Sequence, residues 1–501
     1  MRYSAFGQAS GVALLSCCVL FAQNNDGLIA YKAGNFELAV PLLRRAAAQA
    51  PQDAEVQAAL LSSLVYAGKL DEASEADEHD AAAFTESPEV LAARGEFAFY
   101  MGDMGQAEKL FKAAIKFKEA TPRAVFGLSR LYRAACFYRT ARLLCLRAHS
   151  IDPEDALITQ SFIRYAAPAK RRELLEPFAA LHPWLYKHYD QEESSSLEIR
   201  AAIGDKRLFE REGPPQETTL HFVFLMKDAL HARGVGLEVR INESHPLKML
   251  FDTGASGIVV SQKAIDKAGL QHLGSGISWG VGDKGTRNSF AAISDTCQVG
   301  ILKFNTCLIR ALEGKGRIAG DEDGLIGADF FQDYVVGIDF QRHLLHLKPL
   351  PPKPVDPQGY DRVIPPDETS FTPVFRFGHE LFLTTKVNNK RSGLFLLDTG
   401  SEVSNIDSTF ASLSTKLSGN SLVRMRGISG DVTKVFEADK AELQFARFRQ
   451  SNLGLLALNL NNAPEHQDVR MAGILGLPVL AMFRLTIDYR NGLVNFDYAV
   501  K

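Results

Sequence analysis

The sequence predicts a multidomain protein in which an all-α helical-repeat solenoid precedes two all-β lobes that share one plan. Small residues recur every 34 positions through the first third of the chain, which is a spacing of stacked helix pairs. After about residue 218 the pattern changes to short alternating apolar runs bounded by glycine, asparagine and proline, as in β-structure. Two of those runs end in the same tripeptide, Asp-Thr-Gly, which indicates a duplicated domain.

The composition is that of an ordinary folded protein. Of the 501 residues, 46% are hydrophobic and 23% are charged, and the length suggests about three domains. Because 56 basic residues face 59 acidic ones, the net charge is only −3, and a nucleic-acid partner is not predicted. Six cysteines are too few for a disulfide-rich scaffold.

Residues 1–22 are predicted to be a cleaved secretory signal. Arg2 supplies a positive start, residues 11–22 are apolar, and polar residues follow. The apolar run is shorter than the roughly 20 residues that span a bilayer, and no later stretch predicts a transmembrane helix. We therefore expect export to the periplasm or the extracellular space. The alternatives are a buried first helix and a lipid anchor at Cys17.

The 34-residue period defines a helical region over residues 23–190. Gly34, Gly68 and Gly102 suit turns between paired helices, and small residues allow the helices to cross closely. The pattern over residues 23–155 resembles the tetratricopeptide repeat, with a capping helix pair after it. Stacked pairs form a concave surface, which predicts either docking of a peptide or protein partner or a scaffold without a partner of its own.

The rest of the chain divides into four segments. Residues 191–217 are polar and predict a linker with one short helix, and residues 351–369 are a second, proline-rich linker. The predicted β lobes occupy residues 218–350 and 370–501.

Each lobe carries the same three motifs in the same order. An apolar strand ends at Asp252 in the first lobe and at Asp398 in the second. In each lobe a glycine-rich segment follows the aspartate, 28 residues later in the first lobe and 29 in the second. Both segments are typical of the tips of mobile hairpins. An apolar pair flanked by glycines comes next, at residues 324–327 and 473–476, and from there the two sequences align at a constant offset of 149.

These motifs resemble the aspartic peptidases, and within them the retropepsin-like lobes found in bacterial proteins. The resemblance implies that one aspartate from each lobe, Asp252 and Asp398, forms a catalytic pair. It implies that Thr253 and Thr399 lock the two turns together. It also implies flaps that close over an extended peptide substrate. The remaining residues that it places at the site are Gly254, Gly400 and Ser401 in the turns, and Trp279, Gly280, Val281, Gly282, Gly427, Ile428, Ser429 and Gly430 in the flaps.

Two adjacent carboxylates suit hydrolysis without a metal or cofactor. They cannot both ionise, so they share one proton; the ionised one activates water and the protonated one polarises the carbonyl. Ser401 can donate a hydrogen bond to Asp398, whereas Ala255 cannot do so for Asp252. We therefore expect Asp398 to be the more acidic member and Asp252 to hold the proton.

Two further features have alternative interpretations. Cys297 and Cys307 flank a hairpin turn near residues 300–303, which predicts that they lie opposite each other, either as a disulfide or as two free thiols. Trp279 could cover a side-chain pocket or pack under its own hairpin.

The sequence as a whole predicts an exported aspartic endopeptidase that cleaves peptides or unfolded proteins and has a repeat domain for protein docking. The alternative is a catalytically inactive binding scaffold on the same folds, with a groove that holds an extended chain. The lobes could pair within one chain or between two chains; two different lobes on one short linker favour the first.

Overall fold

The computed structural model divides the chain into two compact units, Met1–Arg133 with Tyr138–Lys187, and Ala134–Phe137 with His188–Lys501. The described residues are 26–117, 121–186, 189–242, 245–314, 322–352, 356, 359–419, 423, 425–462 and 469–498. The predicted signal at residues 1–22, with Cys17, lies outside them. Within this described part, no helix has the length and apolarity needed to cross a membrane.

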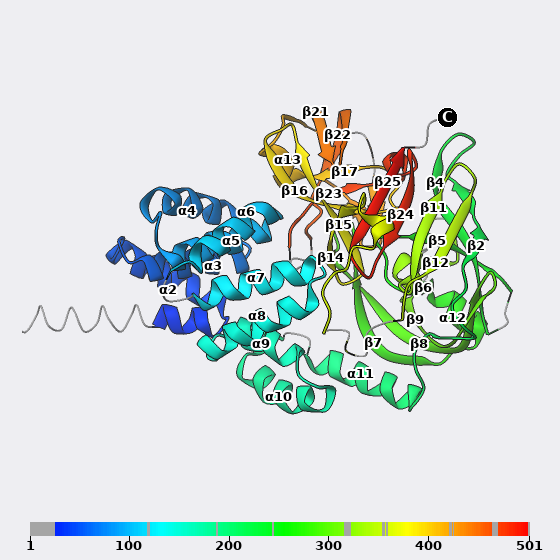
Figure 1. Ribbon diagram of the computed structural model, residues 1–501, viewed down its shortest axis with the longest axis horizontal. Coiled ribbons are helices and arrows are strands. Elements are labelled where there is room, and N and C mark those ends of the chain that lie inside the picture. Colours follow the sequence, from blue (N-terminus) through cyan, green and yellow to red (C-terminus); the bar gives the residue numbers. More distant parts are fainter. Residues whose placement is uncertain are drawn as a thin grey trace, which may run out of the picture. The chain divides into compact units, whose positions relative to one another are not determined.

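The first unit is helical, as predicted (Figure 1). Its helices comprise residues 26–32, α2 (Phe36–Gln49), α3 (Ala54–Tyr66), α4 (Leu70–Ala83), α5 (Pro88–Tyr100), α6 (Met104–Ala114), α7 (Pro122–Ala134), α8 (Tyr138–Ile151), α9 (Ala156–Arg164), α10 (Pro168–Leu181) and the short η1 (Pro183–Leu185).

The 34-residue period has a direct structural cause in this unit. Gly34, Gly68 and Gly102 lie in the turns before α2, α4 and α6, with φ angles of 75°, 70° and 80°. Such left-handed angles favour glycine, because glycine has no Cβ to clash. Helix α3 packs against α2 and α5, and α5 packs against α6. The repeated helix pairs are therefore present, and their assignment to tetratricopeptide repeats stays a prediction.

Two glycines inside helices contact the same aromatic ring. A Cβ added to Gly95 of α5 would lie 2.6 Å from the ring of Phe111, and one added to Gly127 of α7 would lie 2.2 Å from the same ring. Phe111, fully buried, thus occupies the space that two glycines leave open.

The second unit contains both β lobes. The first lobe has helix α12 (Gln262–Ala268), the short η2 (Ala328–Phe331) and one large sheet. That sheet consists of β1 (Glu210–Arg211), β3 (Val223–Met226), β4 (Ala232–Ile241), β5 (Leu247–Asp252), β6 (Ile258–Ser261), β7 (His272–Trp279), β8 (Thr286–Val299), β9 (Leu302–Leu312) and β10 (Gly324–Gly327).

The second lobe repeats this arrangement with helices α13 (Ser408–Ser412) and α14 (Leu477–Leu480). Its main sheet consists of β14 (Phe375–Phe377), β15 (Glu380–Val387), β16 (Arg391–Leu397), β17 (Asn405–Asp407), β18 (Leu417–Ser418), β21 (Val435–Phe445), β22 (Phe448–Leu458) and β23 (Met471–Leu475), and a separate hairpin consists of β19 (Met425–Gly427) and β20 (Gly430–Val432).

A third sheet joins the two lobes within one chain. Its strand order is β13 (Thr372–Pro373), β25 (Leu493–Tyr498), β24 (Phe483–Asp488), β11 (Tyr334–Asp339), β12 (Leu344–Pro349) and β2 (Thr218–His221). Figure 1 shows β24 and β25, in red, beside β11 and β12. One continuous apolar core extends through both lobes, so the lobes form one folded body.

The same strand crossing positions both predicted catalytic turns. Strand β10 pairs in parallel with β5 and antiparallel with β6, so that Gly327 lies opposite Asp252. In the second lobe β23 lies between β16 and β17 in the same way. A Cβ on Gly324 would lie 2.3 Å from the carbonyl oxygen of Val259, which explains the glycine at that position.

The segment predicted as a linker, residues 191–217, is more ordered than a connection with one short helix. Helix α11 (Tyr189–Ile203) packs along β7, where the backbone N–H of Gly274 donates to the Glu198 carboxylate at 2.6 Å. Strand β1 then pairs with β9. These contacts attach the segment to the first lobe.

Candidate active site

Asp252 and Asp398 meet at the interface of the two lobes, although they lie 146 residues apart in sequence. Their carboxyl groups share a hydrogen bond. Each carboxylate also accepts a backbone N–H from its own turn: Gly254 donates to Asp252 Oδ1 at 2.7 Å, and Gly400 donates to Asp398 Oδ1 at 2.8 Å. The two turns therefore hold the predicted pair in contact.

The two threonines after these aspartates lock the turns together. The backbone N–H of Thr253 donates to Thr399 Oγ1 at 3.1 Å, and that of Thr399 donates to Thr253 Oγ1 at 3.0 Å. Each hydroxyl also donates across the interface, Thr253 to the carbonyl of Leu397 at 2.6 Å and Thr399 to that of Phe251 at 2.9 Å. All four hydrogen bonds are buried.

The glycines of the turns leave room for the opposite carboxyl group. A Cβ on Gly400 would lie 2.5 Å from Asp252 Cγ, and one on Gly254 would lie 3.1 Å from Asp398 Cγ. The first distance is too short for any side chain, so a larger residue at Gly400 would push the aspartates apart. Glycine at these two positions therefore allows the close approach of the two turns.

Burial raises the pKa of both carboxyl groups. The nearby charge of Asp252 further raises the pKa of Asp398, because two adjacent carboxylates repel each other. The pKa of Asp252 is held lower by the N–H of Gly254, by the hydrogen bond with Asp398 and by the charge of His379. The two carboxyl groups therefore hold one shared proton between them.

The predicted asymmetry between the two aspartates stays a prediction, but the contact on which it relied is not formed. The prediction relied on a hydrogen bond from the Ser401 hydroxyl to Asp398, but that hydroxyl donates to the carbonyl of Val403 at 2.9 Å. Asp398 therefore lacks the stabilisation that was expected to make it the more acidic member.

His379, which sequence reasoning missed, is close to the pair. It lies in the turn between β14 and β15, and its Nε2 is 3.2 Å from the carbonyl oxygen of Gly254. Its imidazole thus contacts the Asp252 turn of the opposite lobe. No motif in the sequence marks His379.

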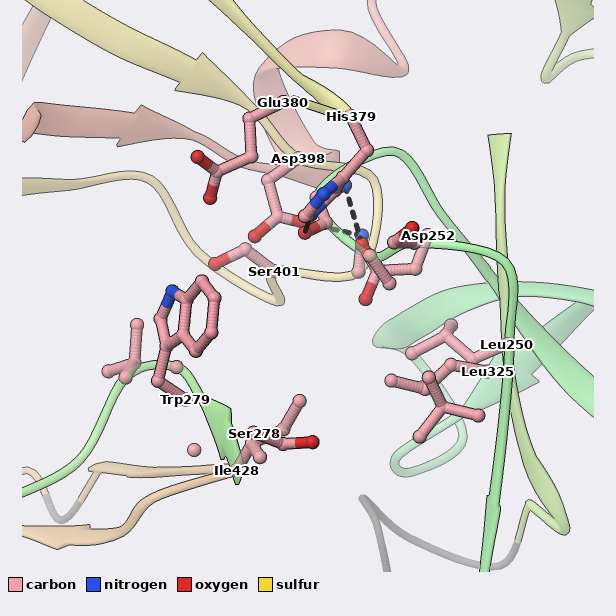
Figure 2. Close-up of a pocket in the computed structure, with 18 of the residues that line it drawn as sticks. Leu250, Asp252, Ser278, Trp279, Leu325, His379, Glu380, Asp398, Ser401 and Ile428 are labelled. Atoms are coloured by element: carbon pink, nitrogen blue, oxygen red, sulfur yellow. Dashed lines mark hydrogen bonds between the residues drawn. The ribbon is translucent and has the colours of Figure 1, made fainter. Parts of the chain in front are cut away.

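The aspartates lie in a cavity of about 1300 Å³ between the lobes and the flaps. Figure 2 shows Leu250 and Leu325 on the Asp252 side, and Glu380, Ser401 and Trp279 on the Asp398 side. Trp279, 41% exposed, lines this cavity.

The two predicted flaps meet at their tips. The first is the β7–β8 hairpin with Gly280, Val281 and Gly282 in its turn, and the second is the β19–β20 hairpin with Gly427, Ile428, Ser429 and Gly430. The N–H of Ser429 donates to the carbonyl of Val281 at 3.0 Å, and the N–H of Lys284 donates to that of Ser429 at 3.0 Å. The flaps therefore form a closed cover above the aspartates.

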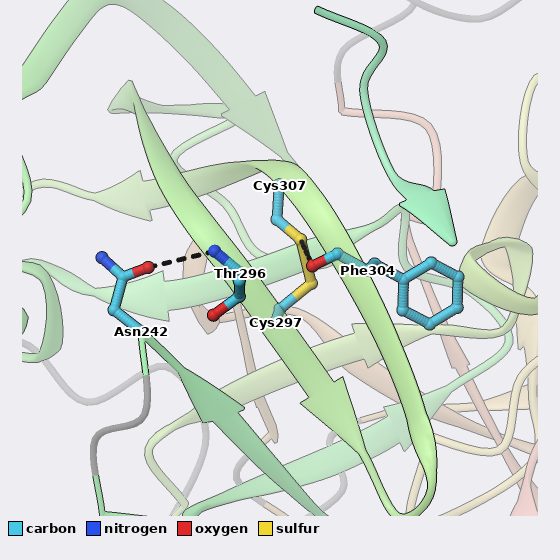
Figure 3. Close-up of a disulfide and its surroundings, with 5 residues drawn as sticks. All are labelled: Asn242, Thr296, Cys297, Phe304 and Cys307. Atoms are coloured by element: carbon cyan, nitrogen blue, oxygen red, sulfur yellow. Dashed lines mark hydrogen bonds between the residues drawn. A yellow bond between two sulfur atoms is a disulfide. The ribbon is translucent and has the colours of Figure 1, made fainter. Parts of the chain in front are cut away.

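Cys297 and Cys307 form a disulfide, which selects one of the two predicted alternatives (Figure 3). The predicted register was wrong. The hairpin turn is only Gly300 and Ile301, so Cys297 lies opposite Phe304 rather than opposite Cys307. The two Cα atoms are nevertheless only 6.3 Å apart. The other described cysteines, Cys136 and Cys145, are buried free thiols.

The site geometry agrees with a comparison against protein-family models. Residues 237–333 match the gag-polyprotein putative aspartyl protease family. The match includes Asp252, the first flap and the crossing strand β10. No curated protein matches the chain. Among the described residues, no group of three or more His, Cys, Asp or Glu side chains could hold a metal ion.

Proposed function

We propose that the protein is an aspartic endopeptidase whose catalytic pair is Asp252 and Asp398. The observation that carries the proposal is the hydrogen-bonded contact of the two buried carboxyl groups between reciprocally bonded threonines. The aspartyl-protease family match of the first lobe supports the same reaction class.

In the proposed mechanism the two aspartates have different roles. Ionised Asp252 accepts a proton from a water molecule, and the resulting hydroxide adds to the peptide carbonyl carbon. Protonated Asp398 donates its hydrogen bond to the carbonyl oxygen, where negative charge develops. The proton on Asp252 then passes to the leaving nitrogen, the C–N bond breaks, and the pair returns to one shared proton.

The flaps and turns support this chemistry by positioning and by exclusion of water. The cavity of about 1300 Å³ has room for several side chains of an extended peptide. Because the flap tips are bonded to each other, the flaps must separate to admit a chain and close again over it. An internal stretch of an unfolded chain fits such an entry, which favours an endopeptidase.

Hydrolysis of an unstructured protein between about pH 3 and pH 7 tests the proposal, with and without a pepstatin-type inhibitor. We expect cleavage that Asp252→Asn and Asp398→Asn each reduce by at least about a hundredfold. Asp295→Asn is the matched control, since Asp295 is exposed and outside the catalytic cavity. Undiminished cleavage by purified Asp252→Asn protein would overturn the proposal in favour of a contaminant or a different site.

We further propose that the protein is exported and that the helical unit, residues 23–190, docks a protein. The Cys297–Cys307 disulfide supports an oxidising compartment, and the sequence of residues 1–22 supports a cleaved signal. The proposed lobes are residues 218–350 and 370–501. Cell fractionation with N-terminal sequencing of the mature protein tests export; an uncleaved protein found in the cytoplasm would exclude it.

A further inference from the structure

The two walls beside the aspartates can be compared residue by residue. In the first lobe Leu250 pairs with Gly236, and in the second lobe Leu396 pairs with Phe382. Leu250 and Leu396 are 146 positions apart in the sequence, and so are Gly236 and Phe382. The two aspartates have the same separation. The same offset makes Glu380 the counterpart of Gly234.

The part of the first-lobe wall around Leu250 is apolar, because Gly234 has no side chain. A Cβ at Gly234 would lie 2.1 Å from Leu250 Cδ1, so Leu250 fills the space that a longer residue would need. Leu250 belongs to a cluster of buried leucines, with Ile428 of the opposite flap packed against it. This side of the cavity is suited to an apolar side chain.

The second-lobe wall presents a carboxylate in the corresponding place. Glu380 is half-buried and lines the cavity, and Figure 2 shows its carboxylate on the same side as Asp398 and Ser401. Burial raises the pKa of Glu380, and His379 beside it lowers this pKa. Among the described residues, none forms a hydrogen bond or ion pair with this carboxylate.

Other carboxylates that line the cavity have partners. Glu402 accepts from Lys227 Nζ at 2.6 Å, and Asp329 accepts from the N–H of Gly257 at 2.8 Å. A partly desolvated carboxylate without a partner is costly, and a cation supplied by a ligand would remove that cost. Glu380 is thus the carboxylate of this wall that is open to a ligand.

We propose that Glu380 is a specificity-determining residue, which selects substrates with lysine or arginine on one side of the scissile bond, while the Leu250 wall takes an apolar residue on the other side. This inference rests on the proposed peptidase function. Trp279 lies on the Glu380 side of the cavity, and its indole offers a surface for the aliphatic stem or the cation of such a side chain.

Matched peptides test this selection. Lysine and norleucine differ only by the terminal amine, so peptides with leucine–lysine or lysine–leucine at the scissile bond are compared with their norleucine counterparts. We expect kcat/KM to favour lysine by about tenfold or more in one of the two orders. Glu380→Gln should bring this ratio close to one, and Glu380→Lys should favour a glutamate peptide instead.

Glu437→Gln is the matched control, since Glu437 lies on β21 of the same lobe and outside the cavity. It should keep the lysine preference. Thermal unfolding of each variant shows whether it folds, and Glu380→Asp provides a second variant that keeps the charge.

The outcomes separate failure of the Glu380 inference from failure of the proposed peptidase function. Cleavage of all peptides without a lysine preference, or a preference that Glu380→Gln retains, would overturn the inference and leave the peptidase function standing. An equal loss on lysine and norleucine peptides would assign Glu380 to catalysis and likewise overturn it. Failure to cleave any peptide or unfolded protein would instead refute the proposed function.

Discussion

Thr253 and Thr399 exchange backbone-to-hydroxyl hydrogen bonds of 3.1 and 3.0 Å across the interface of the lobes. Each hydroxyl also donates to a carbonyl that precedes the opposite aspartate. The position of each carboxyl group therefore depends on a side chain of the other lobe.

Thr253→Ala should damage both stability and activity. The change leaves the N–H of Thr399 and the carbonyl of Leu397 buried without their partners, at a cost of about 2–4 kcal/mol in the free energy of unfolding. Denaturant unfolding and kcat/KM measure the two effects. Thr253→Ser, which keeps the hydroxyl, should lose much less; equal losses in the two variants would show that the methyl group matters more than the hydrogen bonds.

The activity should follow a bell-shaped pH profile. The acidic limb reports protonation of Asp252 and the basic limb reports ionisation of Asp398, and since both pKa values are raised, both limbs should lie above the ordinary pKa of a carboxyl group. His379→Asn removes a positive charge that lowers the pKa of Asp252, so the acidic limb should move to higher pH.

The pH dependence of kcat/KM between about pH 3 and pH 8 measures both effects. His221→Asn is the control, because His221 is exposed on β2 and does not line the cavity. An acidic limb that stays in place in His379→Asn would contradict the electrostatic role of His379.

Asp398→Asn should stabilise the protein at neutral pH and much less at low pH. The folded-state pKa of Asp398 is raised, so its contribution to stability is fully present below the ordinary carboxyl pKa and is lost as the pH rises through the raised value. Asparagine cannot ionise, so the variant avoids the loss of stability that the parent protein undergoes when Asp398 ionises. Thermal unfolding at about pH 7 and about pH 3 should show a higher Tm only at the former; the reverse order would contradict the raised pKa.

Gly282→Ala should weaken substrate binding by keeping the flaps apart. Gly282 has a φ of 139°, and a Cβ there would lie 2.3 Å from the carbonyl carbon of Ser429 at the opposite tip. We expect kcat/KM to fall by about tenfold or more, with little change in Tm. Lys284→Ala changes the same tip but keeps its backbone hydrogen bond to Ser429, and it should stay close to the parent protein.

Replacement of both Cys297 and Cys307 by alanine should lower the free energy of unfolding by about 2–3 kcal/mol, because the disulfide closes a short loop with a sequence separation of 10. Denaturant unfolding with and without a reductant measures this. The reductant should destabilise the parent protein and leave the double variant unchanged; a parent protein that is indifferent to complete reduction would contradict the prediction.

The sequence contains enough information to locate the aspartates, the threonines and both flaps, because duplication places each motif twice in one order. It does not contain the direction of the Ser401 hydroxyl, which turns to Val403. It also does not show that the turn at His379 reaches Gly254 of the other lobe. The first fact is a matter of local turn geometry, and the second arises only when the lobes pack together.

The predicted cross-strand pairing of Cys297 with Cys307 was wrong for a local reason. A turn of only Gly300 and Ile301 shifts every cross-strand pair of the hairpin from the arrangement that symmetry about residues 300–303 predicts. Composition and spacing identify a hairpin, but a difference of a few residues in its turn decides which side chains face each other.

The sheet that combines β24 and β25 with β11 and β12 has a consequence for processing of the chain. Strand β11 of the first lobe is hydrogen-bonded directly to β24 of the second. The covalent connection near residues 351–369 is therefore not what keeps the two lobes associated. A nick there would leave a two-fragment assembly that still carries one aspartate from each half, so cutting of the chain at this point would be compatible with the proposed activity.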